Sequence, residues 1–487
     1  MAIDERQINA LVDAVVQKLA PRIGGQMPVQ TARADYVVTY GQRRASASGT
    51  GRRGIFEDVD SAVAAARDAH EQLLRLDLET RGKMIQAMRE VTARNAEDLS
   101  RRAVEETKLG RVEDKIQKNL LVAWKTPGIE ILRPISYTGD HGLTLIERAP
   151  FGVIAGITPT TNPTETILCN AIGMLAGGNT VVFNVHPSAK RVSRYHVEML
   201  NDAIVAAGGP ENCICSVAEP TIESSQALMK HKGTRLVVVT GGPAVVKTAM
   251  ASGKRAICAG PGNPPCVVDE TAHIDRAGRE IVKSASFDNN VICILEKEIF
   301  AVASIADRLK EAMCAHGAYE VKGEAIRRLE KLVVAEDGAH PSKDWVGRDA
   351  AKIARAAGID VPEKTRLLLA EVDAMHPFVQ AELLMPVMGF VRVPTVDDAI
   401  ACALQAEHGF GHTATMHSTN IDNLSRMARA VNTSIFVKNG GALAGLGVDG
   451  EGYTSFTIAS PTGEGITTAL SFTRERRCSL KDSFRIV

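Results

Sequence analysis

The stretch GVIAGITPTTNPTETILCNAIGMLAGGNTVVFNV, residues 152–185, decides the fold of this chain. It contains an apolar strand at 152–157, a predicted helix at 164–176 and a second apolar strand at 180–185. Strands without a polar face that are joined by a helix indicate neighbouring parallel strands, covered on both sides. The sequence therefore predicts an α/β protein built on a parallel sheet.

The same alternation extends outward from this stretch. It continues through further predicted helices and strands at 188–207, 214–217, 221–231 and 235–240. A second alternating region runs from CVVDE at 266–270 to TSIFVKN at 433–439, and a hairpin-like stretch occupies 137–150. Parallel sheets of this type bind ligands at the carboxyl ends of their strands, so the loops that follow the strands are the candidate sites.

Length and composition limit the possible functions. A chain of 487 residues is too long for one core, which predicts two or three packed units. With 57 basic and 57 acidic residues there is no net charge, which argues against nucleic acid or an anionic membrane as partner. No apolar run approaches the ~20 residues of a membrane span, and the start does not resemble a secretory signal. The nine scattered cysteines favour reduced thiols in a cytoplasmic protein.

Two close pairs of potential metal ligands are weak candidates. Cys213 and Cys215 form a C-x-C pair without a second pair nearby. His408 and His412 are four residues apart, but Gly409 and Gly411 disfavour the helix that would place both on one face. The sequence therefore predicts no metal site.

The first residues differ from the rest of the chain. Residues 1–20 have apolar positions at helical spacing and predict an amphipathic helix, and the Pro- and Gly-rich residues 21–45 predict a flexible linker. A helix on a flexible linker is better suited to binding a partner, although folding back onto the chain's own core is the alternative.

Two local motifs leave their meaning open. In TGGPAVVKTAM, residues 240–250, Val246 stands where a phosphate loop requires glycine, but a helix start after Gly241 and Gly242 could still face a pyrophosphate. Cys293, within FDNNVICILEKE, is either a buried inert cysteine or a nucleophile, and its neighbours alone favour the first.

The order of motifs resolves this ambiguity, because it resembles the aldehyde dehydrogenase superfamily over roughly residues 50–475. ERAPFGVIAGITPTTNP resembles the segment that ends in the oxyanion-hole asparagine, and NNVICILEKE resembles the nucleophile loop. TVVFNVHPS, TGG and AELLMPVMGF resemble the ribose, pyrophosphate and nicotinamide-ribose segments, and EHGFGHTATMHS and NTSIFVKN resemble the closing strands of the catalytic domain. The resemblance implies Cys293 and Asn162 as catalytic residues. The cofactor-binding residues it implies are Pro159, Thr160, Asn184, His186, Pro187, Gly241, Gly242, Pro243, Gly260 and Glu382.

One departure from the family pattern narrows the activity. Hydrolytic members carry a water-activating glutamate where this chain has Ala259, within AGPGNPP. Without that base a thioester on Cys293 would wait for another nucleophile, since general-base help is worth ~100-fold or more. The chain most resembles CoA-acylating propionaldehyde or acetaldehyde dehydrogenases of bacterial microcompartments, which implies an NAD-dependent enzyme that makes acyl-CoA from a short-chain aldehyde. The alternatives are a hydrolytic enzyme with His412 or Glu296 as base, and a catalytically idle cargo protein.

The resemblance also implies cofactor, partners and location. NAD is only weakly favoured over NADP, because Pro187, preceded by His186, stands where relatives carry a carboxylate for the ribose. Coenzyme A is the expected co-substrate. The N-terminal helix resembles an encapsulation peptide that binds shell or cargo proteins, which places the protein in a microcompartment lumen. Aldehyde length depends on pocket volume, and the sequence does not define it.

The expected domains follow the same resemblance. A Rossmann-type NAD(P)-binding domain is expected over 46–133 and 148–259, and an α/β catalytic domain over 260–457. A small β element over 134–147 and 458–487 is expected to join subunits into a homodimer or homotetramer.

Overall fold

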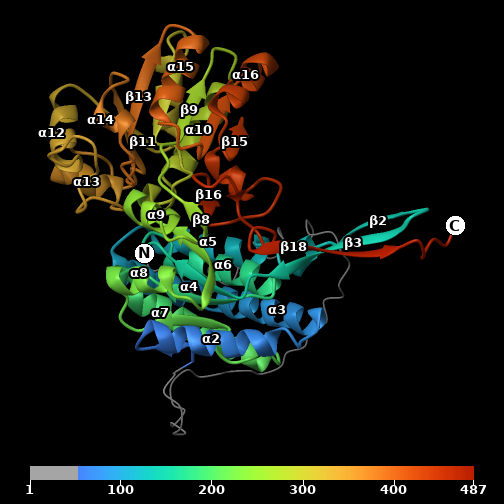
Figure 1. Ribbon diagram of the computed structural model, residues 1–487. Coiled ribbons are helices and arrows are strands. Elements are labelled where there is room, and N and C mark those ends of the chain that lie inside the picture. Colours follow the sequence, from blue (N-terminus) through green and yellow to red (C-terminus); the bar gives the residue numbers. More distant parts are fainter. Residues whose placement is uncertain (1–52) are drawn as a thin grey trace, which may run out of the picture. The chain divides into compact units, whose positions relative to one another are not determined.

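The computed structural model describes residues 53–487, so the predicted N-terminal helix and most of its linker lie outside the described part. The described residues contain two large parallel sheets, a three-stranded antiparallel sheet and a two-stranded one (Figure 1). The α/β fold with parallel sheets predicted from the sequence is confirmed. In residues 53–487 no helix is both long and apolar enough to cross a membrane.

The first large sheet has six parallel strands in the order β1-β6-β5-β4-β7-β8. Its strands are β1 (Ile55–Phe56), β4 (Val153–Ile157), β5 (Thr180–Asn184), β6 (Ile214–Val217), β7 (Thr234–Thr240) and β8 (Arg255–Ala259). The helices in this part of the chain are α2 (Val59–Leu73), α3 (Leu78–Arg94), α4 (Ala96–Thr107), α5 (Val112–Lys125), α6 (Pro163–Ala176), α7 (Lys190–Ala206), α8 (Ile222–Lys230) and α9 (Pro243–Met250).

The centre of this sheet explains where a ligand can bind. Every residue of β4 and β5 is buried, as is every residue of α6 between them, which is why this stretch has no polar face. β4 pairs with β5 on one side and with β7 on the other, so the order of the strands reverses at β4. The loops that follow β4 and β7 therefore diverge at a topological switch point, where doubly wound sheets form ligand crevices.

The second large sheet has seven parallel strands in the order β11-β12-β13-β10-β9-β14-β15. Its strands are β9 (Pro265–Val268), β10 (Glu298–Val302), β11 (Ala318–Val321), β12 (Leu367–Glu371), β13 (Val387–Val393), β14 (Thr413–His417) and β15 (Ile435–Lys438). The accompanying helices are α10 (Ile274–Ala285), α11 (Ala306–Ala315), α12 (Glu324–Val333), α13 (Ala350–Ala356), α14 (Pro377–Gln380), α15 (Val396–Ala406) and α16 (Ile421–Val431).

The antiparallel sheet joins distant parts of the chain. β3 (Gly142–Pro150) pairs with β2 (Ile135–Gly139) and with β18 (Thr473–Lys481), and Figure 1 shows the three as a narrow ribbon beside the larger sheets. Most of β18 and β2 is exposed. The hairpin predicted at 137–150 is confirmed. The remaining short pair is β16 (Ile458–Ala459) with β17 (Gly465–Ile466).

One predicted helix begins later than expected. The stretch expected to be helical from 188 starts with a 3-10 turn, η3 (Pro187–Ala189), and α7 follows only at Lys190. Ala189 has φ −132°, outside the helical region, so the two segments do not merge. The other 3-10 turns are η2 (Ile129–Ile131), η4 (Phe287–Asn290) and η5 (Ala442–Leu446).

Candidate active site

A cavity of about 830 Å³ lies where the loops after β4, β5, β7 and β8 meet the segment after η4. All of the catalytic and cofactor-binding residues predicted from the sequence line it. They are Cys293, Asn162, Pro159, Thr160, Asn184, His186, Pro187, Gly241, Gly242, Pro243, Gly260 and Glu382. Sequence motifs more than 200 residues apart therefore contribute to one chamber.

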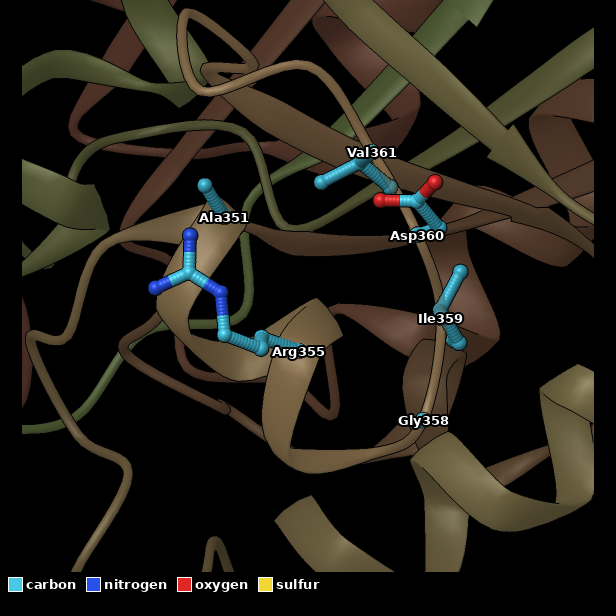
Figure 2. Close-up of a pocket in the computed structure, with 6 residues that line it drawn as sticks. All are labelled: Ala351, Arg355, Gly358, Ile359, Asp360 and Val361. Carbon is cyan, nitrogen blue, oxygen red and sulfur yellow. The ribbon is translucent and has the colours of Figure 1, made fainter.

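A second, smaller hollow of about 260 Å³ lies at the end of α13. Figure 2 shows Arg355 on the helix, with Ile359 and Asp360 on the segment that follows it. Arg355 is paired with Glu363, and none of the predicted site residues lines this hollow. The larger cavity is therefore the candidate active site.

The loop after β4 brings Asn162 to the cavity. Asn162 is the N-cap residue of α6, and its backbone carbonyl accepts the hydrogen bond from Thr166 N–H at 3.1 Å. Its side chain does not cap the helix. Instead, Asn162 Oδ1 accepts a hydrogen bond from Lys118 Nζ at 2.6 Å, and Nδ2 donates to Thr161 Oγ1 at 3.1 Å. The amide is thus oriented by its neighbours rather than by the helix.

The turn that precedes the nucleophile has an uncommon backbone. Asp288, Asn289 and Asn290 have φ values of 46°, 53° and 66°, three successive residues in the left-handed region. Asp and Asn tolerate this region better than most residues. Asn290 Nδ2 donates to Ala285 O at 2.7 Å, and Asn289 Nδ2 donates to Gly347 O at 3.0 Å. These contacts fix the turn that leads to Cys293.

Cys293 is partly buried and is one of the residues that line the cavity. Burial and the nearby Glu382 raise the pKa of the thiol to about 12, while Lys297, the backbone N–H of Cys293 and Lys118 act in the opposite direction. The sequence led us to expect a loop that stabilises the thiolate. The backbone N–H of Cys293 does act in that direction, but in the ligand-free site burial and the Glu382 carboxylate outweigh it.

Glu382 is the only carboxylate among the described residues that line the cavity. Burial raises its pKa to about 7, and Lys297 and a hydrogen bond from Gly262 N–H partly oppose this shift. The carboxylate follows α14 and so approaches the cavity from the second sheet. Its side chain therefore brings a hydrogen-bond acceptor to the cavity.

The two alternative bases do not line the cavity. Glu296 is buried, accepts a hydrogen bond from Ala442 N–H at 2.7 Å and has its pKa raised to about 7 by burial. His412 is buried against Gly262, and burial lowers its pKa to about 4. At the position of the missing glutamate, Ala259 ends β8 as a buried residue without ionisable atoms.

The opposite side of the cavity suits a dinucleotide. Gly241 and Gly242 lead into α9, and a Cβ at Gly242 would meet no heavy atom within 4 Å, so a phosphate can approach the backbone at this helix start. Thr158 and Thr160 contribute buried hydroxyls that have no partner among the described residues. Open backbone and unpaired hydroxyls fit the phosphate and amide groups of a nicotinamide dinucleotide.

Metal ligands do not gather at this site or elsewhere in the described part. Within residues 53–487 no cluster of His, Cys, Asp and Glu could hold a metal ion. Cys213 and Cys215 are buried, and burial raises their pKa, to about 12 for Cys213.

Sequence reasoning missed the charged residues behind the cavity wall. Lys115 and Lys118 on α5 are buried and both contact Asp288 Oδ2, Lys115 at 3.0 Å. One signal was available in the sequence. Lys115 and Lys118 share a helical stripe with the buried Val122, at i, i+3 and i+7, where an amphipathic helix normally carries apolar residues.

Comparison with known proteins agrees with this geometry. The aldehyde dehydrogenase family model matches residues 43–449. An acetylating acetaldehyde dehydrogenase of Escherichia coli is 53% identical over 439 residues, which cover 89% of this chain and 94% of that protein.

Two solved structures are similar over most of the chain. A Rhodopseudomonas palustris propionaldehyde dehydrogenase, with bound CoA and an acylated cysteine, is 50% identical with a TM-score of 0.87 and covers 88% of this chain and 98% of its own. A propionaldehyde dehydrogenase from the Clostridium phytofermentans fucose utilisation bacterial microcompartment is 47% identical with a TM-score of 0.88 and covers 89% of this chain and 100% of its own.

Proposed function

The chain belongs to the aldehyde dehydrogenase family, and we propose that it oxidises a short-chain aldehyde with NAD+ and coenzyme A to the acyl-CoA. The observation that carries the proposal is the composition of the cavity wall. Cys293 and Asn162 share the cavity, and Ala259, directly before the lining residue Gly260, occupies the position at which hydrolytic members have their water-activating glutamate. Such a site can form a thioester but has no base there to hydrolyse it.

The first chemical step belongs to Cys293. Its thiolate adds to the aldehyde carbonyl carbon, and the electron pair of the C=O bond moves to oxygen, which gives a thiohemiacetal anion. The amide of Asn162 and the backbone N–H of Cys293 are the donors for this oxyanion. One donor of this kind is typically worth ~3 to 4 kcal/mol of transition-state stabilisation.

The second step completes the oxidation. When bound, NAD+ accepts the hydride from the thiohemiacetal carbon, so that the acyl group is left as a thioester on Cys293. Glu382 would hold the sugar that carries the nicotinamide, and the backbone N–H groups at the start of α9 would hold the pyrophosphate. The thiol of coenzyme A then gives its proton to solvent, and its thiolate attacks the thioester carbonyl, so that acyl-CoA forms and Cys293 leaves as the thiolate.

The raised pKa of Cys293 has a consequence for the order of events. In the ligand-free site burial and Glu382 hold the thiol protonated at neutral pH. Engagement of Glu382 by a ribose hydroxyl and arrival of a positively charged nicotinamide both favour the thiolate. We therefore expect Cys293 to be a better nucleophile when NAD+ is bound than in the ligand-free site.

Product analysis tests the proposal. Purified protein with propionaldehyde and NAD+ is expected to form propionyl-CoA when coenzyme A is present. Without coenzyme A, free acid should form at about one hundredth of that rate or below. Free acid produced at the same rate without coenzyme A would support the hydrolytic alternative, with Glu296 or His412 acting after a rearrangement. A comparison of NAD+ with NADP+ in the same assay determines the cofactor preference.

Assembly and location extend the proposal. The exposed ribbon of β2, β3 and β18 carries apolar side chains such as Tyr137 and Leu480, which are 62% and 47% exposed and suit contact with a second copy. We therefore expect a homodimer or homotetramer, and a monomer by light scattering would contradict this. A relative from a fucose utilisation microcompartment supports a microcompartment lumen for this chain as well.

The role of residues 1–20 has its own test. A variant without them should retain its turnover but lose co-purification with microcompartment shell or cargo proteins. Unchanged co-purification would rule out this segment as the targeting helix. Lost turnover with retained co-purification would instead indicate that the segment serves the catalytic core.

A further inference from the structure

Lys118 contacts both parts of the proposed catalytic machinery from behind the cavity wall. It is 1% exposed, lies on α5 and does not line the cavity. Its ammonium group contacts Asn162 Oδ1 at 2.6 Å, Glu165 Oε1 at 3.5 Å and Asp288 Oδ2. Asn162 Oδ1 and Asp288 Oδ2 each accept a hydrogen bond from the ammonium, whereas Glu165 Oε1 is only an ion-pair partner, so two short contacts hold Lys118 in its orientation.

The contact with Asn162 determines which end of its amide faces the substrate. An ammonium group can only donate, so the amide atom that faces Lys118 must be the oxygen. The NH2 group is consequently turned away from Lys118. One of its N–H bonds donates to Thr161 Oγ1 at 3.1 Å, and within the described residues the other is left for a substrate oxygen. The opposite rotamer would present an acceptor to the oxyanion and repel it.

The contact with Asp288 ties this orientation to the nucleophile loop. Asp288 is fully buried and begins the left-handed turn that leads to Cys293. Its second oxygen, Oδ1, accepts a hydrogen bond from Arg111 N–H at 2.7 Å. The oxyanion donor and the loop of the nucleophile therefore share one buried cation, which fixes their relative position.

Lys115 provides a natural contrast on the same helix. It is equally buried and also contacts Asp288 Oδ2, at 3.0 Å. Its second contact, however, is the backbone carbonyl of Thr161 at 3.0 Å and not the side chain of Asn162. Lys115 can anchor the loop, but it cannot set the orientation of the amide.

We infer that Lys118 is a positioning residue for catalysis, which holds the Asn162 amide with its NH2 group toward the carbonyl oxygen of the aldehyde or thioester. The inference rests on the proposed function. It adds to the site a residue that lies behind the cavity wall and whose main effect on the oxyanion is to orient Asn162. A lysine in this role serves by geometry, whereas a methionine of similar length would let the amide rotate.

The test compares Lys118→Met with Lys115→Met in a single-turnover assay of NADH formation. Lys118→Met should lower the acylation rate about 30- to 100-fold, which is less than the ~100- to 1,000-fold loss typical of removing an oxyanion donor, because the amide is still present but no longer held in one orientation. Lys115→Met should lower it less than about fivefold, because the amide of Asn162 keeps its partner. Lys118→Arg should recover part of the loss, since a guanidinium also only donates.

A double-mutant cycle separates positioning from general structural damage. In the Asn162→Ala background, Lys118→Met should cause less than a threefold further loss, because there is no amide left to orient. Iodoacetamide labelling of the Cys293 peptide, followed by mass spectrometry, reports on the nucleophile loop. In Lys118→Met, the fold-loss in the labelling rate should be at least ten times smaller than the fold-loss in the acylation rate. If Lys118→Met is unstable, the charge-balanced Lys118→Met/Glu165→Gln variant serves the same comparison.

Each outcome decides between the possibilities. Equal losses for the two lysine variants, or a full further loss in the Asn162→Ala background, would overturn the positioning role and leave the proposed function intact. A wild-type protein that forms no NADH with aldehyde would overturn both. A labelling rate that falls as much as the acylation rate would show that Lys118 acts on the thiol and not through Asn162.

Discussion

The two walls of the cavity are built in different ways. The cofactor wall, which we define as the loops after β4, β5, β7 and β8, consists of small residues, prolines and open backbone at strand ends. The nucleophile wall, residues 287–297, lines the cavity with Val291, Ile292 and Cys293, and it is backed by a left-handed turn and by the buried charges of Asp288 and α5. The cofactor wall should therefore tolerate substitution, whereas the nucleophile wall should be destabilised when Asp288, the carboxylate that both buried lysines share, loses its charge.

The largest expected effect concerns the nucleophile itself. Cys293→Ala should reduce acyl-CoA formation to background, because no thioester can form, while the thermal unfolding midpoint stays within a few degrees of the wild type. The matched control is Cys314→Ala, which alters an exposed thiol on α11 and should keep full activity. Full activity in Cys293→Ala would show that Cys293 is not the nucleophile, and the nucleophile wall would then have no chemical role that sets it apart from the cofactor wall.

The buried charges of the nucleophile wall give the next largest effect. Asp288→Asn keeps the size of the side chain but turns an amide toward two ammonium groups, and it should lower the free energy of unfolding by about 3–5 kcal/mol. Asp349→Asn is the control. Its carboxylate is 55% exposed and pairs with Arg111, so about 1 kcal/mol or less is expected. Chemical denaturation measures both, and similar losses would contradict the prediction.

Two glycines, Gly110 beside Asp288 and Gly242 in the cofactor wall, allow the same comparison to be made for the backbone. Gly110 has φ +77°, and a Cβ there would lie 2.0 Å from Asp288 Oδ1, so Gly110→Ala should lower the free energy of unfolding by about 1–3 kcal/mol. Gly242, in the cofactor wall, has φ −71° and open space around its Cβ position. Gly242→Ala should change stability by about 0.5 kcal/mol or less. If chemical denaturation gave the same loss of unfolding free energy for Gly110→Ala and Gly242→Ala, the backbone next to Asp288 would be no more rigid than the cofactor wall.

The smallest expected effect concerns the charge between the two walls. The Glu382 carboxylate, with a pKa of about 7, is ionised above that pH and then disfavours the Cys293 thiolate. Glu382→Gln removes that charge and should lower the thiol pKa, so that iodoacetamide labelling at pH 9 becomes about three- to tenfold faster.

The pH dependence supplies the internal control for this experiment. At pH 6 the Glu382 carboxyl is largely protonated in the wild type, so the two proteins should label at similar rates. Glu311→Gln, an exposed substitution on α11, should match the wild type at both pH values. A labelling rate of Glu382→Gln that is unchanged at pH 9 would show that the carboxylate does not control the thiol.

The difference between the two walls also explains which site residues could be predicted from the sequence. The residues of the cofactor wall follow apolar strands directly, so their order along the chain predicts their meeting at one end of the sheet. Cys293, Asn162 and Glu382 were found because a resemblance places them in a known order. Their convergence in one cavity is a property of the three-dimensional fold.

The ionic part of the nucleophile wall was not predictable in the same way. Asp288 lies 170 positions after Lys118 in the chain, and nothing in either local sequence indicates that they meet. Charged residues in a helix usually face solvent, so the buried stripe of α5 was not recognised. The raised pKa of Cys293 was also missed, because burial depends on tertiary packing that no short motif reports.

Ala259 also affects the direction in which the reaction can run. A carboxylate at this position would release the product as a free acid, and the large favourable free energy of thioester hydrolysis would make that step a one-way exit. With a methyl group there, the acyl group leaves only by exchange between two sulfur atoms, a step that is close to balanced. The same chamber can therefore reduce an acyl-CoA to the aldehyde when NADH is abundant, so metabolite ratios, and not the protein, set the net direction of flux.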